Sequence, residues 1–305
     1  MKYALNICIF ITAILGVIFS ESCSTQKKQV SEEAKSAPII EDKTVALTTI
    51  SQDGISFVID STNYGKISYE KIKKQIYDEP GPMMDAPEHI CVYLEDTRPL
   101  PAFEKGGRYF FPGRSTICVF PLEDKSVDNY LKSYPVIYSE TGRLLDLLWR
   151  DINPLTKNCG WCVPDIWESI RSAGNSMHAK YSKIKFQSGE GIVFLTQYSQ
   201  DMLPSPANCE ELTYSFQGLT NDRKYFVAGA FAVIHPQLPK GIDFTRDIGQ
   251  RVKKVNGELE IDRGYLEEDE KLLEGFTEES FSPSLKKLQA LISSIKVESL
   301  ENRKK

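Results

Sequence analysis

Residues 211–239 read ELTYSFQGLTNDRKYFVAGAFAVIHPQLP, and this stretch decides the fold class of the chain. From Leu212 to Gln217 large apolar and small polar side chains alternate, and from Tyr225 to Ile234 almost every residue is apolar. Period-2 patterning rich in aromatic and β-branched residues is typical of strands. Asn221-Asp222 lies between the two runs and tolerates a tight turn. The stretch therefore predicts a hairpin of Leu212–Leu219 and Tyr225–Ile234 in the middle of an antiparallel sheet.

Other strands are predicted on both sides of this hairpin. Tyr181–Phe186 and Ile192–Tyr198 carry the same alternation around Ser188-Gly189, which predicts a second hairpin directly upstream. Apolar runs bounded by Gly or Pro predict the remaining strands: Gly54–Ile59, Glu88–Glu95, Ser115–Pro121 and a short final strand at Ile295–Val297.

Helical spacing of Leu and Ile predicts helices within Asp128–Arg150, Tyr265–Gly275 and Ser284–Ser294. Shorter helical turns are expected in Ser68–Tyr77 and Trp167–Met177. Strands that cluster together, with helices at separate places, indicate the α+β class. We therefore expect a central antiparallel sheet with helices packed on it.

The composition is that of a soluble globular protein. The chain has 305 residues, of which 41% are hydrophobic and 26% charged, and this length is ample for a large core. The formal net charge is −5 and the pI is about 5.5, with Lys and Arg scattered along the sequence. Proteins that bind nucleic acid usually carry a basic patch or stripe. Nucleic acid is therefore not an expected partner.

The N-terminus predicts export from the cytoplasm. A basic start at Lys2 precedes an apolar run to Phe19, and small residues come before Cys23. This resembles a bacterial lipoprotein signal, in which Cys23 is lipidated and anchors the chain to the membrane. Ordinary secretion and an uncleaved anchor are the alternatives. We expect a signal peptide at 1–22, the lipid-attachment cysteine and a flexible tether at 23–50, one α+β domain at 51–298 and a disordered tail at 299–305.

Several motifs together resemble a known family. They are PEHI at 87–90, FLTQYSQ at 194–200, ELTYSFQGLTNDRKYFV at 211–227, IHPQLP at 234–239 and SPSLKKLQALISSIKV at 282–297. The chain from Gly54 to Val297 is similar to a family of uncharacterised extracytoplasmic bacterial proteins, which implies no particular activity. The order of elements also resembles the PsbP-like α/β/α sandwich, with GISF as opening strand and a final helix leading into IKV. That second resemblance concerns the fold only.

The cysteines carry the sharpest chemical signal. Cys159-Gly160-Trp161-Cys162 matches the CxxC motif of a thioredoxin-type redox centre. However, a polar loop precedes this motif, whereas a thioredoxin-type motif follows the buried strand of a βαβ unit. Structural disulfides are therefore the favoured interpretation, since disulfides persist outside the cytoplasm. Cys91 and Cys118 lie in two predicted strands, and they can bridge if these strands are neighbours. Cys209 can pair with either member of the CGWC motif.

A zinc site is the third interpretation of these cysteines. Cys159, Cys162, Cys209 and His178 are a donor set that zinc accepts, yet the sequence has no second CxxC or HxxxH motif. We therefore expect no metal and no cofactor. His89 and His235 stand at strand ends, where backbone hydrogen bonds are the expected partners of their rings.

The remaining candidates are weaker. The acidic residues Glu267–Glu270 are expected to form a solvated helix face. No GxSxG, HExxH or Walker motif occurs, so the sequence names no catalytic residue. Aromatic residues at alternating strand positions can line a ligand-binding sheet face, although core packing is their usual role. These are Tyr198, Tyr214, Phe216 and Tyr225.

Taken together, the sequence predicts a membrane-anchored lipoprotein or secreted domain of the bacterial cell envelope. Its expected role is a binding module for a protein partner or a small ligand. The alternative is a thiol–disulfide oxidoreductase that uses Cys159 and Cys162.

Overall fold

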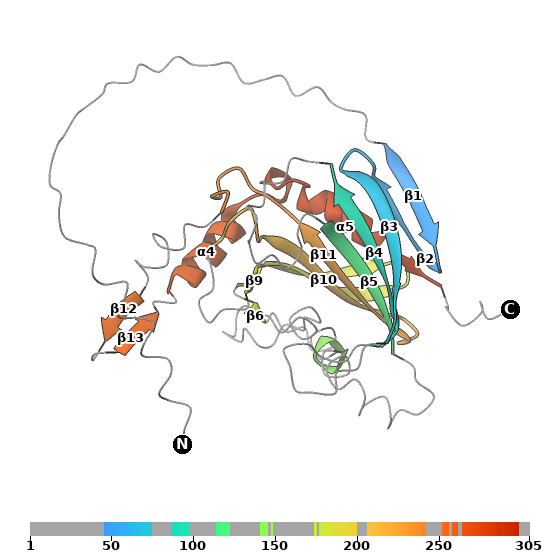
Figure 1. The fold of residues 1–305 in the computed structure, drawn as a ribbon, viewed down its shortest axis with the longest axis horizontal. Helices are drawn as coiled ribbons and strands as arrows, with labels where there is room; N and C mark the ends of the chain where they lie inside the picture. Colours follow the sequence, from blue (N-terminus) through green and yellow to red (C-terminus); the bar gives the residue numbers. More distant parts are fainter. Residues whose placement is uncertain are drawn as a thin grey trace, which may run out of the picture. The chain divides into compact units, whose positions relative to one another are not determined.

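A seven-stranded antiparallel sheet is the centre of the structure, a computed structural model (Figure 1). The structure describes residues 46–74, 87–97, 114–122, 141–145, 148, 174–175, 177–199, 206–241, 252–255, 258–261 and 264–298. All of them belong to one compact unit, Thr44–Lys305. The strand order is β3 (Tyr64–Ile72), β4 (His89–Asp96), β5 (Arg114–Pro121), β11 (Tyr225–Ala232), β10 (Thr213–Thr220), β8 (Gly189–Thr196) and β7 (Ala179–Phe186).

The predicted hairpin β10–β11 is confirmed, and it lies at the centre of this sheet. Thr213 pairs with Ala232 and Leu219 with Phe226, and every residue of β10 is buried. Strand β11 is almost wholly apolar because both faces of the sheet are covered at this strand, so its side chains are buried on either side. The edge strands β3 and β7 are partly exposed and carry several lysines, which oppose edge-to-edge aggregation.

A smaller sheet lies beside the first, in the order β1 (Leu47–Gln52), β2 (Ile55–Asp60) and β14 (Lys296–Val297). Asp53 and Gly54 connect β1 to β2 with φ of 50° and 76°. Two consecutive left-handed residues define a tight hairpin turn, for which Asp-Gly is a preferred pair. The described residues also include two pairs of short strands: β6 (Gly174–Asn175) with β9 (Tyr198–Ser199), and β12 (Val252–Val255) with β13 (Glu258–Ile261).

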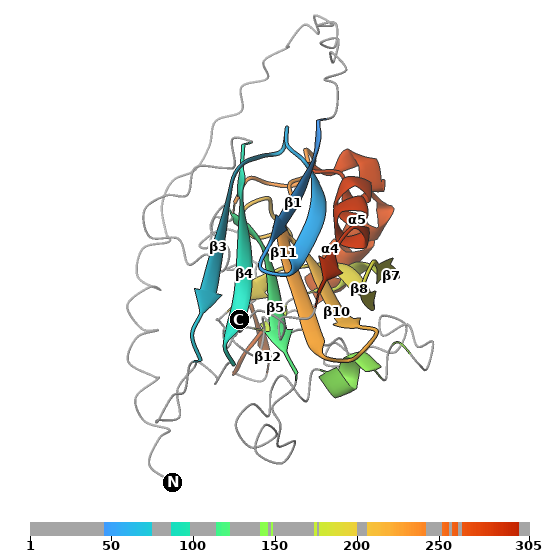
Figure 2. The ribbon, with the colours of Figure 1, turned by 90° about the vertical axis from the view of Figure 1, so that its right-hand side faces the viewer.

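Two helices near the C-terminus cover one face of the large sheet: α4 (Gly264–Gly275) and α5 (Leu285–Ser293), with the short 3-10 helix η5 (Glu278–Ser280) between them (Figure 2). Ser284 caps α5 by accepting a hydrogen bond from the backbone of Lys287. The apolar face of α5 is buried against the sheet through Leu285, Leu288, Leu291 and Ile292. Residues 141–145 are also helical.

The sheet separates two hydrophobic clusters. Tyr214, Phe216 and Val227 point to the face covered by α4, α5 and β2, whereas Phe194, Phe226 and Ala228 point to the opposite face. Leu144 from the helical residues 141–145 packs on that second face. The fold is therefore α+β and sheet-dominated, with helices on the antiparallel sheet as the sequence predicts.

Three local predictions are wrong. Ser68–Ile72, expected to be part of a helical turn, belongs to strand β3, because pairing with β4 over the whole strand outweighs the weak signal of two isoleucines one turn apart. Residues 47–50, expected to be the end of the tether, are strand in β1. Gly174-Asn175, expected in a helical turn, pairs with Tyr198-Ser199.

Candidate functional site

A pocket of about 280 Å³ opens between strand β2 and helix α5, and its lining is predominantly apolar. Strand β14 pairs only with Ile55 and Ser56, so the rest of this edge of β2 faces α5 instead of another strand. Ser294, at the end of α5, accepts a hydrogen bond from the backbone N–H of Val58 and joins helix to strand. The pocket is lined by Leu47, Val58, Asp60, Asn63, Tyr64, Pro283, Lys287, Leu288, Ala290 and Leu291.

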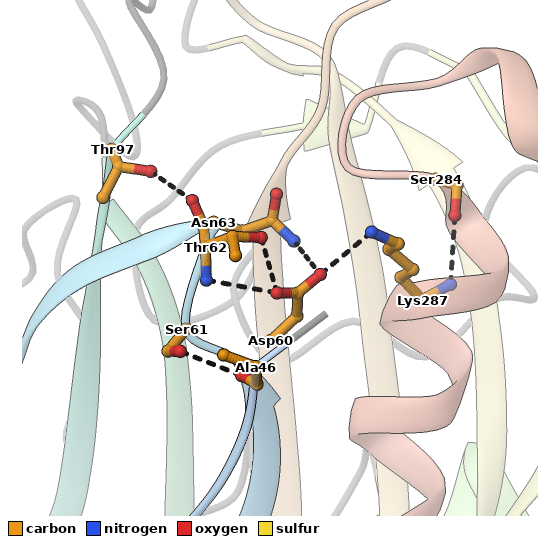
Figure 3. A network of polar contacts seen from close by, with 8 residues as sticks. All are labelled: Ala46, Asp60, Ser61, Thr62, Asn63, Thr97, Ser284 and Lys287. Carbon is orange, nitrogen blue, oxygen red and sulfur yellow. Dashed lines mark hydrogen bonds and ion pairs between the residues drawn. The ribbon is translucent and has the colours of Figure 1, made fainter. Parts of the chain in front are cut away.

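Asp60 is the polar centre of this site (Figure 3). Its Oδ1 accepts hydrogen bonds from the backbone N–H and the hydroxyl of Thr62, at 3.1 and 2.6 Å. Its Oδ2 accepts from Asn63 Nδ2 at 3.1 Å and from Lys287 Nζ at 2.9 Å. A carboxylate offers about four acceptor positions. All four are occupied, so Asp60 holds Lys287 in place and has no capacity left for a cationic ligand.

The turn that follows Asp60 is held by residues next to the ends of β1 and β4 (Figure 3). The hydroxyl of Ser61 donates to the carbonyl of Ala46 at 2.9 Å, and the hydroxyl of Thr97 donates to the carbonyl of Thr62 at 2.8 Å. Hydrogen bonds that fix a turn also fix the side chains it presents. The wall of the pocket is therefore formed before any ligand arrives.

Among the described residues that line the pocket, Lys287 is the cationic one. Its side chain is 49% exposed, whereas that of Asp60 is 8% exposed. An ammonium group has three N–H donors, so Lys287 can donate to a ligand while it stays bonded to Asp60. Burial by itself raises the pKa of Asp60, but the hydrogen bonds from Thr62 and Lys287 outweigh it and lower that pKa below 3.8. The Asp60 carboxylate is therefore ionised at neutral pH.

The predicted bridge between Cys91 and Cys118 is confirmed. The two residues are directly opposite one another on β4 and β5, with 4.1 Å between their Cα atoms. Cys209 is a free thiol, whose Sγ donates to the carbonyl of His235 at 3.2 Å. Burial raises the pKa of Cys209, which disfavours the reactive thiolate. Cys23, Cys159 and Cys162 lie outside the described residues.

His178 lies in a buried position beside the Phe194 ring, and its Nε2 has no hydrogen-bond partner among the residues that the structure describes. Burial, with a smaller contribution from Arg143, lowers its pKa to about 4. Within the described part of the chain, neither His178 nor Cys209 belongs to a group of three metal-type donors. The other members of the predicted zinc set, Cys159 and Cys162, lie outside that part.

A second hollow, of about 490 Å³, lies beside His235 and is open to solvent. The hydroxyl of Ser280 donates to the carbonyl of Thr277 at 2.7 Å, and the backbone N–H of Gln237 donates to His235 Nδ1. His235 must therefore donate from Nε2 to Ser280 at 2.9 Å. A nucleophilic serine donates in the opposite direction. This pair is structural, and the predicted backbone partner of His235 is confirmed.

The four aromatic residues predicted to share a ligand-binding face are divided between the two faces. Tyr214, Phe216 and Tyr225 belong to the cluster under the helices, and Tyr198 belongs to the opposite cluster. The hydroxyl of Tyr214 accepts a hydrogen bond from Gln289 of α5. All four side chains are buried, so core packing accounts for them.

The acidic face of α4 is only partly solvated, contrary to the sequence interpretation. Glu270 accepts a hydrogen bond from the backbone N–H of His178 at 2.9 Å, and Asp269 accepts one from Ala207 at 2.9 Å. Glu274 accepts from the backbone N–H of Lys180. Glu270 and Glu274 thus bond backbone groups at the bulged start of β7, whereas Asp269 bonds the segment around Ala207; sequence periodicity carries no signal for these roles.

The sequence interpretation also missed the pocket at Asp60 and Lys287. Two local signals point toward it: Asp53-Gly54 marks the β1–β2 hairpin, and Asp60 followed by Thr62 is a common turn pattern. Neither signal reveals that α5 supplies the opposite wall.

Comparison of the chain with protein-family models, with curated proteins and with solved structures finds no match. In the described part of the chain, no helix has both the length and the apolar character needed to cross a membrane.

Proposed function

We propose that this protein is a binding module of the bacterial cell envelope. Its ligand is a small amphiphile with an apolar body and an anionic head group, held in the pocket between β2 and α5. The observation that carries the proposal is the combination of an apolar pocket of about 280 Å³ with Lys287 at its rim. Binding pockets for small molecules usually combine apolar walls with a few placed polar groups; the volume of this pocket lies just under their usual range of about 300–1,000 Å³, which limits the ligand to a small one.

The charge of the head group follows from the hydrogen bonds around Asp60. This carboxylate already accepts four hydrogen bonds, so a cationic ligand would have to displace one of its partners. Lys287 retains unused donors and is half-exposed. A carboxylate or sulfonate can therefore bind Lys287 without breaking the Asp60–Lys287 ion pair.

The apolar body is expected to lie against Val58, Leu288 and Leu291. Leu47, which is 70% exposed on the edge strand β1, also lines this pocket. Burial of apolar surface contributes roughly 25 cal/mol per Å² to association. A ligand that covers Leu47 would remove the most exposed large apolar side chain of the described residues from water.

Binding can be tested with 8-anilinonaphthalene-1-sulfonate, which has an aromatic body and a sulfonate, and with octanoate as a competitor. Ala290 lines the pocket from an exposed position of α5, so Ala290→Trp should fill the pocket with a large ring. This variant should show neither the fluorescence of the bound probe nor the decrease in fluorescence that octanoate causes in the wild type. Lys287→Gln should weaken binding roughly tenfold, since a charge-assisted hydrogen bond contributes about 1.5 kcal/mol.

Lys286→Gln is the matched control, because Lys286 is one residue away but pairs with Glu279 outside the pocket. Equal loss in Lys286→Gln and Lys287→Gln would show that only net charge matters and would refute the proposed head-group contact. Undiminished binding in Ala290→Trp would place the probe elsewhere.

We propose the cellular location from the N-terminal sequence. Cys23 follows the signal-like segment 1–22 and would carry the lipid that anchors the domain, with residues 24–45 as the tether. Metabolic labelling with an alkyne fatty acid should mark the protein and not its Cys23→Ser variant. Labelling that persists in Cys23→Ser would exclude this anchor.

We also propose the family and the finer fold class. The motifs shared with extracytoplasmic bacterial proteins support membership of that family. A PsbP-like α/β/α sandwich is supported by the apolar cluster on each face of the sheet. Helices α4 and α5 lie on one face, and the helical residues 141–145 contribute Leu144 to the cluster on the other. An experimentally determined structure with a bare second face would contradict the sandwich.

A further inference from the structure

Three metal-type donors meet on the sheet face opposite α4 and α5. His89, Cys91 and Cys118 each offer a ligand atom, and these atoms lie within 4.8 Å of one another. All three residues are buried. In the oxidised chain, the disulfide between the two cysteines occupies both sulfur atoms.

The strand register places these donors together. His89 and Cys91 are two residues apart on β4 and therefore point to the same face. Cys118 on β5 is directly opposite Cys91. The hydrogen-bonded ladder between β4 and β5 runs from Ile90–Val119 to Glu95–Arg114, so it holds the two cysteine positions opposite one another independently of the disulfide.

His89 is oriented as a ligand. Its Nδ1 lies 2.8 Å from the carbonyl of Pro87 and can only donate to it, which leaves the lone pair of a neutral ring on Nε2. A backbone carbonyl bonded to the second ring nitrogen is the usual support of a metal-binding histidine. The ring also stacks on Phe120, with 4.4 Å between centroids, so its plane is fixed.

We propose that the reduced protein binds one thiophilic metal ion through Cys91 Sγ, Cys118 Sγ and His89 Nε2. A dithiol reductant opens the disulfide: the S–S bond takes up two electrons and two protons, and the reductant becomes a disulfide. Metal binding then displaces the two thiol protons. The disulfide and the metal site are thus two states of one pair of cysteines, and the redox poise of the compartment selects between them.

The donor set selects the ion. Two thiolates and one imidazole suit Zn²⁺ or Cu⁺, whereas Mg²⁺ and Ca²⁺ require oxygen donors. Two thiolates and Zn²⁺ are together neutral, which a buried site favours.

The test uses the full chain in detergent with five cysteines replaced, so that only the Cys91–Cys118 pair remains. The replacements are Cys8→Ser, Cys23→Ser, Cys159→Ser, Cys162→Ser and Cys209→Ser. The chain is refolded from denaturant with a phosphine reductant, and thiol titration verifies two free thiols. Co²⁺ then serves as a spectroscopic probe, because thiolate ligation gives a charge-transfer band in the near ultraviolet, and Zn²⁺ should displace it.

We expect one Co²⁺ per reduced chain and none in the oxidised chain. His89→Phe keeps the ring stacked on Phe120 but removes the nitrogen, and should weaken binding at least about tenfold with both thiols intact. His89→Gln serves as a second variant if His89→Phe does not fold. The Cys91→Ser, Cys118→Ser variant should give no charge-transfer band.

Two results would overturn the proposal. Co²⁺ affinity that is unchanged in both His89 variants would exclude the histidine ligand. A reduced chain that shows no native circular dichroism, or binds no Co²⁺ when folded, would show that the two strands do not hold a three-donor site without the disulfide.

Discussion

His178 is expected to control the stability of this protein in mild acid. The perturbation is His178→Phe, which keeps an aromatic ring beside Phe194 and removes the titrating group. The native pKa of His178 is lowered to about 4 by burial, with Arg143 as a second cause, from an ordinary 6.5. The folded state therefore binds the proton less readily than the unfolded state does.

The sign and size of the effect follow from this difference in pKa. Between pH 6.5 and about 4 the unfolded chain takes up a proton that the folded chain does not, so stability is lost as the pH falls through this window. The difference between a pKa of 6.5 in the unfolded chain and a pKa of about 4 in the folded chain corresponds to about 3 kcal/mol at pH 4. This is a large share of the 5–15 kcal/mol that is typical of a folded domain.

The assay is urea unfolding, followed by far-ultraviolet circular dichroism, at several pH values between 7.5 and 4. The wild type should lose about 3 kcal/mol more than His178→Phe over this interval. At pH 7.5 the variant should be at least as stable, because the ring nitrogen without a hydrogen-bond partner is gone.

The control is Phe194→Leu, which alters the packing beside His178 but keeps the imidazole. It should lower stability equally at all pH values. Glu270 titrates nearby with a raised pKa, caused first by burial, so its own contribution to stability decreases as the pH rises and has the opposite sign. Parallel pH profiles for the wild type and His178→Phe would refute the assignment of acid sensitivity to His178.

Three further predictions test the contacts that hold the fold. Glu270→Ala should lower the free energy of unfolding by about 1–3 kcal/mol, because the backbone N–H of His178 loses its acceptor. Glu270→Gln keeps an acceptor oxygen and should change this free energy little. An equal loss of stability in the exposed control Glu268→Ala would contradict the role of Glu270. Replacing both Cys91 and Cys118 by alanine should lower the free energy of unfolding by roughly 3.5 kcal/mol, because the disulfide closes a loop of 27 residues. Urea unfolding without reductant measures this loss, and Cys209→Ala is the control that retains the bridge. Asp60→Asn should lower the free energy of unfolding by roughly 1–2 kcal/mol at pH 7 and by less as the pH falls below 3.8. The reason is that the Asp60 carboxylate, whose pKa is lowered in the folded state, stabilises the fold only while it is charged. A difference between variant and wild type that does not depend on pH would refute the ion-pair contribution.

Local patterns were sufficient for the centre of the sheet. The alternation in Leu212–Gln217, the apolar run after Tyr225 and the turn residues between them correspond to β10, β11 and their connection. The amphipathic spacing of Ser284–Ser294 likewise corresponds to α5. In these segments the buried surface follows the periodicity of the backbone itself, so a short window contains the required information.

Local patterns failed where a distant segment supplies the partner. Ser68–Ile72 is a strand because β4 pairs with it along its whole length, and Glu270 accepts a hydrogen bond from a residue 92 positions away. The pocket depends on the contact between Asp60 and Lys287, which are 227 residues apart. No sequence window contains both walls.

The fold class, the central strands and the amphipathic helix α5 can be inferred from the sequence, because each depends on a repeat of two or 3.6 residues. Only the tertiary structure shows which carboxylates bond backbone groups of distant segments and where a pocket opens, and it confirms the Cys91–Cys118 bridge that the sequence offers as one possibility. These properties depend on strand register and on the docking of α5 against β2, which are set by contacts between segments that are remote in sequence.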